Sequence, residues 1–301
     1  MGPHWGLAIG DERIEGIVLE DAASPRLLRR MRIATESSGG YYHVLGQIHK
    51  LVEVLSAEVG IRPSAIGVAH RGALDPITKT LKGSGDANMD GKPLRTDLET
   101  YLGVPVSLGN AGNCLALAET RFGAVPDVMP AARVVLGIHL GQTVEAGIII
   151  NGRPLIGRQG IAGSWGHNFL DESGGTCACG RIGCVDTVLS VPALEDYYEH
   201  LSGRYLPFAQ IVALAEGGAD AASAKTLERL VYNLARALGP VINLLDPDCI
   251  VVGGPGGQVD AIYKQGVELL KRFVHNTRVD TLLLRPKLGV RAGVYGAGLL
   301  A

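Results

Sequence analysis

The chain has 301 residues, of which 47% are hydrophobic and 19% are charged, a composition typical of a globular protein with a sizeable core. Its 28 basic and 30 acidic residues give a net charge of −2, which excludes the basic footprint of a nucleic-acid-binding protein and a polybasic membrane anchor. No apolar stretch reaches the roughly 18 residues of a membrane-spanning helix, and the N-terminus lacks the features of an export signal. We therefore expect a cytoplasmic protein with no nucleic-acid or membrane partner.

The predicted elements begin with two short strands around a turn at Gly10–Asp11, because apolar residues alternate on both sides of it. A charged linker over 21–32 then leads to another short β segment. Apolar residues at helical spacing predict a helix over 42–60 that ends on a glycine. A strand–turn–helix unit follows over 102–123, and its helix is expected over 110–122.

The opening pattern recurs in the middle of the chain, where strands are predicted over 133–140 and 145–151 around a second tight turn. The repetition indicates two copies of one α/β unit, each beginning with a hairpin whose turn faces a cleft. We place the boundary within 123–132, which contains two prolines, and divide the chain into lobes of residues 1–125 and 126–301. Further elements are expected as a buried strand over 249–252 and as helices over 191–201, 208–216, 222–245 and 262–273.

Three cysteines and a histidine form the strongest local motif. Cys177, Cys179 and Cys184 lie close together in a glycine-rich stretch that follows His167. Three thiolates and one imidazole complete the tetrahedral shell of Zn²⁺, and a closed shell of this kind is structural rather than catalytic. The alternative is three unrelated thiols, two of them in a disulfide.

The same stretch resembles the hallmark of the ROK family of repressors, open reading frames and sugar kinases. A Gly-His pair stands at Gly166–His167, and the pattern G-x-C-x-C-G-x-x-G-C occupies 175–184. The resemblance covers essentially the whole chain and is strongest toward bacterial fructokinase-like members. It implies an α/β, two-lobed actin-like ATPase (ribonuclease H-like) fold with a central cleft, a small-molecule carbohydrate in that cleft, commonly a homodimer, and a terminal helix that packs back on the N-terminal lobe. Other matching segments are 148–153, 160–163, 242–248, 251–254 and 293–298.

By the same resemblance, the carbohydrate contacts are expected from Asn110, Ser164, His167 and Asp186. Ser164 and Asp186 each replace a glutamate of the family pattern. A DNA-binding repressor is disfavoured, because repressor members carry an N-terminal helix-turn-helix domain and this chain starts at the first hairpin.

The two turns that face ATP phosphates in family kinases depart from the family pattern. The first normally reads D-x-G-G-T-K, and here Asp11 and Glu12 stand where the small residues belong. The second normally reads G-T-G-x-G-x-G, and here Glu145 adds a third carboxylate. Repulsion between these carboxylates and ATP would cost several kcal/mol at an effective dielectric constant near 20, so the sequence argues against Mg-ATP as a cofactor. The remaining candidates for phosphate contacts are Gly10, Arg13, Gly141, Thr143, Gly253 and Gly254.

The general base of the family is the aspartate of E-N-D-A-N, which takes the proton of the sugar hydroxyl. The corresponding residue is Ala111, and removal of such a base costs roughly 10²–10⁴ in rate. We expect a sugar-kinase homologue that binds a carbohydrate and has lost ATP-dependent phosphorylation. An active hexose or amino-sugar kinase is one alternative. The other is a repurposed carbohydrate-active enzyme that uses new catalytic groups, with the candidates Asp11, Glu12, Glu145, His70 and His139.

Overall fold

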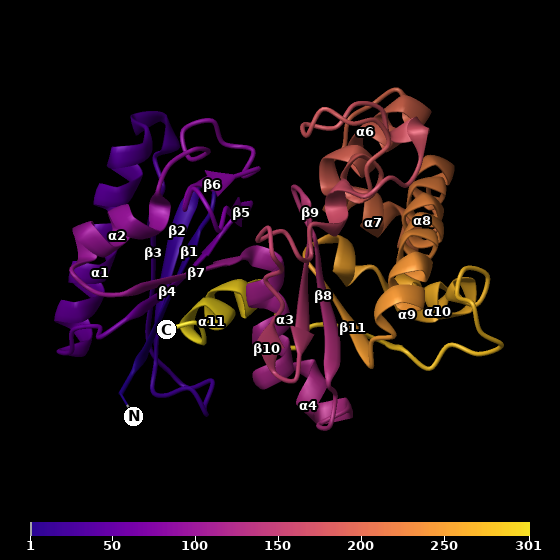
Figure 1. Ribbon diagram of the computed structural model, residues 1–301. Coiled ribbons are helices and arrows are strands. Elements are labelled where there is room, and N and C mark those ends of the chain that lie inside the picture. The colour runs from indigo at the N-terminus through magenta and orange to yellow at the C-terminus, as the bar shows by residue number, and fades with distance from the viewer. Residues whose placement is uncertain (1) are drawn as a thin grey trace.

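The computed structural model describes residues 2–301, and two five-stranded sheets organise it (Figure 1). The strand orders are β3-β2-β1-β4-β7 and β10-β9-β8-β11-β12. The two sheets share one arrangement. In the first, β1 pairs antiparallel with β2 and parallel with β4; in the second, β8 pairs antiparallel with β9 and parallel with β11. The strands are β1 His4–Ile9, β2 Arg13–Leu19, β3 Leu27–Ala34, β4 Ile66–His70, β7 Val106–Asn110, β8 Val134–Leu140, β9 Val144–Ile150, β10 Arg153–Pro154, β11 Cys249–Gly253 and β12 Leu282–Leu284, with a small separate sheet of β5 Ala73–Leu74 and β6 Leu81–Lys82.

Helices cover both sheets. Around the first sheet lie α1 Tyr41–Val59 and α2 Leu94–Leu102, and around the second lie α6 Val191–Ser202, α7 Phe208–Glu216 and α8 Ala221–Leu245. The long helix α8 buries an apolar stripe at helical spacing, including Leu230, Leu234 and Leu238, in the core of the second half. The shorter helices are α4 Ala124–Val128, α5 Asp186–Leu189, α9 Asp260–Lys264 and α10 Gly266–Leu270.

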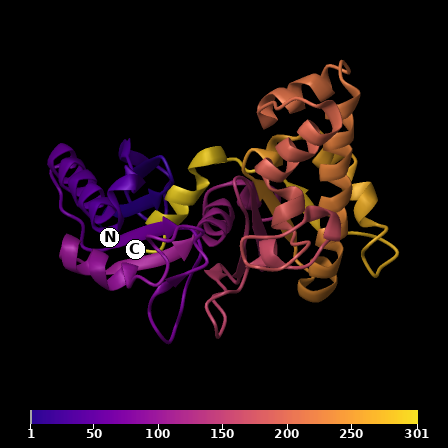
Figure 2. The ribbon, with the colours of Figure 1, turned by 90° about the horizontal axis from the view of Figure 1, so that it is seen from above.

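Two helices, α3 Ala111–Arg121 and α11 Ala292–Gly298, lie side by side between the two sheets (Figures 1 and 2). Helix α11, the last in the chain, packs against β1 and β4, whereas α3 packs against β8 and β9. Glycine makes the close approach of α11 possible, because a Cβ on Gly67 would lie 1.7 Å from the carbonyl oxygen of Ala297. The division into residues 1–125 and 126–301 stays a prediction.

The predicted elements agree with the structure in most places and differ in two. The helix expected over 42–60 is confirmed as α1, and Gly60 ends it in the left-handed conformation with φ 68°. The charged linker over 21–32 is shorter than predicted, because β3 begins at Leu27; its Arg30 and Arg32 pair with Glu15 on the adjacent strand β2, which stabilises charged residues at the sheet edge. The helix expected over 262–273 is instead the pair α9 and α10. Between residues 2 and 301, no helix has the length and apolar character needed to cross a membrane.

Candidate functional site

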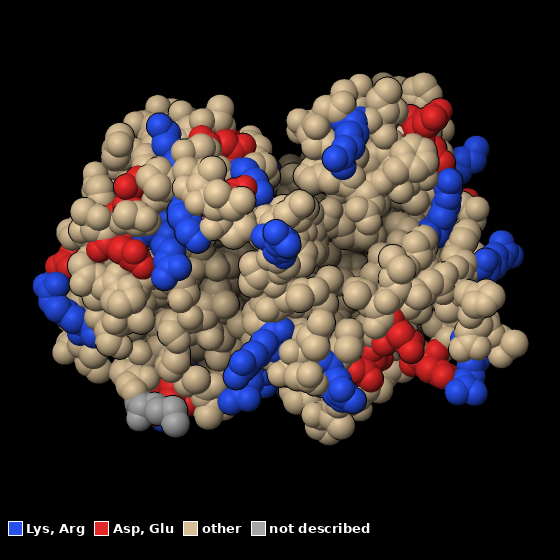
Figure 3. Space-filling model, in the orientation of Figure 1, with Lys and Arg blue, Asp and Glu red and all other residues tan. Residues whose placement is uncertain are grey.

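The surface is notched between the two halves of the molecule (Figure 3), and a cavity of about 450 Å³ lies at the carboxyl ends of β4 and β7. Carboxyl ends of parallel strands are the usual place for ligands in α/β proteins, and this volume falls in the range of small-molecule sites. The first half of the chain contributes most of the lining, and the segment after β10 adds two residues. Lining residues include His70, Asn110, Asn113, Glu99, Ile156 and Gly160.

The turn between β1 and β2 is held by an arginine that the sequence analysis did not single out as a site residue. Both carboxylate oxygens of Asp11 accept hydrogen bonds from Arg71 Nη1 at 2.9 Å. Arg71 follows the buried strand β4 and precedes Gly72, whose φ is 79°. The position of Arg71, directly after a buried parallel strand and before a glycine, could have identified it as a site residue from the sequence. Glu12 and Arg13 point elsewhere: they pair with each other at 3.5 Å, and their side chains are 85% and 58% exposed.

His70 lies at the end of β4 and lines the cavity. Its Nδ1 is 2.8 Å from the carbonyl oxygen of Arg71, so the ring donates this hydrogen bond when Nδ1 carries the proton. Burial lowers the pKa of His70. The ring is therefore a neutral group at neutral pH, fixed in one tautomer.

The first turn of α3 forms one wall of the cavity. The side chain of Asn110 caps this helix by accepting a hydrogen bond from the backbone N–H of Asn113 at 2.6 Å. Ala111 is the first helical residue, so a methyl group stands at the family's base position. The Oδ1 atom of Asn113 is buried and has no hydrogen-bond partner among residues 2–301.

Glu145 lies on β9, opposite His139 of β8. Burial raises the pKa of Glu145 to about 7, and the nearby carboxylate of Asp186 acts in the same direction. Arg71 and the backbone amides of Ala111 and Gly112 act in the opposite direction, because they stabilise the charged carboxylate. Burial lowers the pKa of His139. The structure therefore brings Asp11 and Glu145 to one arginine.

Asp186, one of the predicted carbohydrate contacts of the second half, lies near this arginine as well. Asp186 begins α5, and its Oδ1 accepts a hydrogen bond from the backbone N–H of Val144 at 2.6 Å. Burial raises the pKa of Asp186, whereas His167 and Arg71 act to lower it. Ser164 precedes the short 3₁₀ helix Trp165–His167, and its backbone N–H donates to the carbonyl of Ile161 at 3.0 Å.

The glycines predicted to face phosphates have packing roles in the fold. Gly253 ends β11, and a Cβ there would lie 2.4 Å from Leu115 Cδ1. Gly254 has φ 77° and lies against the backbone of Leu140. Gly141 and Thr143 form the β8–β9 turn, where the Gly141 N–H donates to the Thr143 carbonyl at 3.2 Å. The fold needs Gly253 and Gly254 whether or not a phosphate binds.

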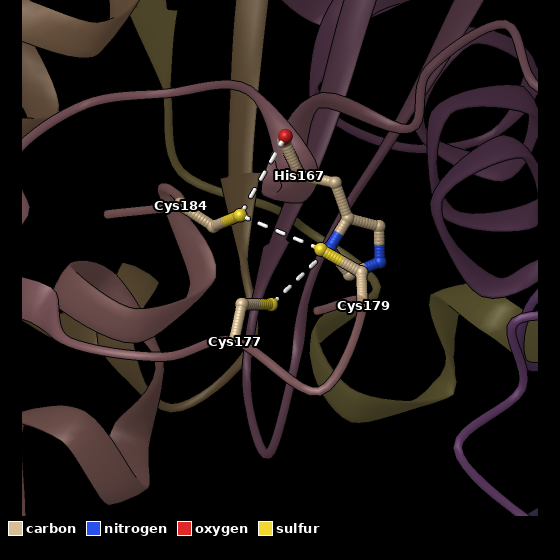
Figure 4. A group of neighbouring side chains, drawn as sticks. All are labelled: His167, Cys177, Cys179 and Cys184. Atoms are coloured by element: carbon tan, nitrogen blue, oxygen red, sulfur yellow. Dashed lines mark hydrogen bonds between the residues drawn. The ribbon is translucent and has the colours of Figure 1, made fainter. Parts of the chain in front are cut away.

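His167 and three cysteines form a cluster that can hold a metal ion (Figure 4). Their four ligand atoms all lie within 4.8 Å of one another, with 3.6 Å between the sulfurs of Cys179 and Cys184 and 3.5 Å between Cys177 Sγ and His167 Nδ1. Two thiolates about 2.3 Å from a tetrahedral zinc ion lie about 3.8 Å apart, so the observed spacing fits such an ion. Glycines at positive φ fold the loop around the four ligand atoms: Gly175, Gly180 and Gly183.

Comparisons with known proteins agree with this architecture. The family model described as ROK family matches residues 4–301. N-acetyl-D-glucosamine kinases of Salmonella newport (strain SL254) and Salmonella typhimurium are each 31% identical to the chain over 307 residues, which cover 99% of this chain and 98% of each relative. The structure of a ROK hexokinase from Thermus thermophilus superposes with a TM-score of 0.86 at 26% identity and covers 99% of this chain and 97% of that one. A ROK family glucokinase from Streptomyces griseus, in complex with glucose and AMPPNP, gives a TM-score of 0.83 at 25% identity and covers 100% and 99%. These matches confirm the predicted actin-like ATPase fold.

Proposed function

The chain belongs to the ROK family, and on that premise we propose that it binds a carbohydrate between its two halves and has lost ATP-dependent phosphorylation. The chain is a homologue of sugar kinases throughout its length. The proposed loss of phosphorylation concerns the turns and the base position only, since the fold is retained.

The ion pair between Asp11 and Arg71 is the observation that carries the loss of nucleotide binding. It occupies the turn that the family resemblance assigns to phosphate. A phosphate placed about 4 Å from the Asp11 carboxylate would be repelled by about 4 kcal/mol per pair of unit charges at an effective dielectric constant near 20. The positive charge of Arg71 offsets part of this repulsion, while its Nη1 is already bound by Asp11. Ala111 removes the proton acceptor as a separate loss.

The cavity of about 450 Å³ supports the carbohydrate part of the proposal, because polar side chains line it beside apolar ones. Asn110 and Asn113 contribute amide groups from the start of α3, and Glu99 contributes a carboxylate from α2. The relatives named above include kinases for N-acetyl-D-glucosamine and a glucokinase with bound glucose. A neutral hexose or an amino hexose is therefore the proposed ligand class.

An active kinase is the second candidate, favoured by 31% identity to N-acetyl-D-glucosamine kinases along the whole chain. It requires another carboxylate to replace Ala111 as base and a rearrangement of Asp11. We propose further that His167, Cys177, Cys179 and Cys184 hold one structural zinc ion that ties the loop over 167–184 together. A homodimer and a cytoplasmic location stay predictions.

Calorimetry tests the proposal with glucose, N-acetylglucosamine, mannose and fructose, each with and without Mg-AMPPNP. We expect at least one sugar to bind, and Mg-AMPPNP neither to bind nor to change the affinity for that sugar. Absence of binding by every sugar would overturn the carbohydrate assignment. Micromolar binding of Mg-AMPPNP would overturn the loss of nucleotide binding and favour the active kinase.

A further inference from the structure

The first turn of α3 has no carboxylate of its own, but a carboxylate reaches it from strand β9. Side chains alternate between the two faces of a strand, so Glu145 and Gly147 share a face. That face meets the start of α3, because a Cβ on Gly147 would lie 2.4 Å from the backbone nitrogen of Asn113. Glu145 lies two residues before Gly147, closer to the β8–β9 turn, and its side chain therefore points to the N-terminus of α3.

The charges around Glu145 agree with this position. The backbone amides of Ala111 and Gly112, which begin α3, stabilise the charged form of the Glu145 carboxyl. Residues from three further elements also face it. They are Arg71 from the segment after β4, Asp186 from α5 and His139 from β8, with Cys114 on α3 itself.

Two acceptor atoms at this helix turn have no hydrogen-bond partner within normal distance and angle in the described part of the chain, although the amides of Ala111 and Gly112 face the Glu145 carboxyl. Glu145 Oε2 and Asn113 Oδ1 are buried, and neither has a hydrogen-bond partner among residues 2–301. A buried acceptor without a donor costs about 1–3 kcal/mol, and more when it is charged. Asn113 lines the cavity of about 450 Å³, so a ligand there can reach Asn113; Glu145 lies next to this turn but is not among the residues that line the cavity. Hydroxyl groups are the donors that a carbohydrate supplies in abundance.

We propose that Glu145 takes the place of the carboxylate missing at Ala111 and accepts a hydrogen bond from a hydroxyl of the bound carbohydrate. Asn113 Oδ1 accepts a second hydroxyl beside it. This inference rests on the proposed carbohydrate binding and adds the residue that selects one hydroxyl of the sugar. Glu145, on β9 just after the second turn, is then a ligand-binding group, whereas the same charge would repel a nucleotide.

The test measures the affinity of wild type, E145Q and the control E216Q for the sugar that binds wild type and for its monodeoxy analogues. Glu216 is exposed at the end of α7. We expect E145Q to weaken binding of the parent sugar about ten- to hundred-fold, as for loss of a hydrogen bond to a charged group, and E216Q to leave it unchanged. One monodeoxy analogue should bind wild type as weakly as the parent sugar binds E145Q, and it should lose little further affinity for E145Q.

The outcomes separate the two proposals. Wild type that binds no sugar overturns carbohydrate binding, and this inference with it. If E145Q binds the sugar as tightly as wild type does, carbohydrate binding stands and only the role of Glu145 is overturned. An equal loss by E145Q for the parent sugar and every deoxy analogue also overturns it, because that pattern describes a general disturbance of the site.

Discussion

Glu145 makes the unliganded protein less stable at neutral pH, since burial raises its pKa from 4.5 to about 7. A carboxyl whose pKa is raised in the folded state binds its proton more tightly there than in the unfolded chain. The protonated carboxyl of Glu145 therefore stabilises the folded state fully below about pH 4.5, and this stabilisation is lost as the pH rises through about 7. A binding group that costs stability is common at functional sites.

The variant E145Q removes this pH-dependent loss. We expect the unfolding free energy of E145Q minus that of wild type to increase by about 1–3 kcal/mol when the pH is raised from 4.5 to 8. Denaturant unfolding at the two pH values measures this difference, with E216Q as the control that should show none. A difference between E145Q and wild type that is the same at both pH values would contradict the assignment of a buried, titrating carboxyl.

Restoring the family base alone should not restore phosphorylation. In A111D a new carboxylate would face Glu145 at the start of α3, while Asp11 would still hold Arg71. We therefore expect no ATP-dependent turnover from A111D in a coupled assay, and the same from the neutral control A111N. Turnover of A111D at about 1 s⁻¹, the low end for ordinary enzymes, would show that nucleotide binding is intact.

At the scale of elements, we propose that a zinc ion on His167 and the three cysteines stabilises the cysteine loop. In C179S one of the four ligands is lost, so we expect less than one zinc ion per chain and a fall in stability of several kcal/mol. Elemental analysis and thermal unfolding measure the two effects. C249A is the control, because it removes a buried thiol on β11 outside the cluster and should keep the metal. Metal-free wild type, freshly purified, would contradict the assignment.

The contact between α11 and the first sheet depends on a glycine. In G67A the new Cβ would meet the carbonyl oxygen of Ala297 at 1.7 Å, so α11 must move away. Overpacking of this kind costs about 1–3 kcal/mol or more, which chemical denaturation would detect. The control G46A places a methyl group on an exposed part of α1 with no atom within 4 Å, and it should stabilise the protein by about 0.5–1 kcal/mol. Equal stability of G67A and wild type would contradict the close packing.

Local patterns predicted most elements, because alternation and helical spacing are properties of neighbouring residues. The first residues of strand β3 were assigned to a linker because its arginines resemble a charged linker, and the partners of these arginines, Glu15 on β2 and Glu58 on α1, lie elsewhere in the sequence. The site shows the same limit. Ala111 and Glu145 were both candidates in the sequence, but their meeting depends on how α3 packs against β9, which no local pattern contains. Arg71 was missed because its partner, Asp11, is distant in the sequence.

At the scale of the whole molecule, two copies of one sheet topology place a hairpin turn from each half near the same region. Arg71 acts on the carboxylates of both halves, since it pairs with Asp11 and influences the pKa values of Glu145 and Asp186. The family resemblance assigns the two turns to phosphate, whereas here Asp11 lies in the first turn and Glu145 lies on β9 just after the second. The architecture is kept, and we propose that the cleft serves the carbohydrate alone.

Hexose phosphate formation tests this account most directly. Purified protein is incubated with Mg-ATP and with the sugar that calorimetry identifies, and an N-acetyl-D-glucosamine kinase of Salmonella typhimurium serves as the positive control for the assay. The account predicts that the sugar binds and that no sugar phosphate forms above the rate without protein. Turnover near 1 s⁻¹ or faster would contradict it and would show that a carboxylate other than the one missing at Ala111 acts as the base.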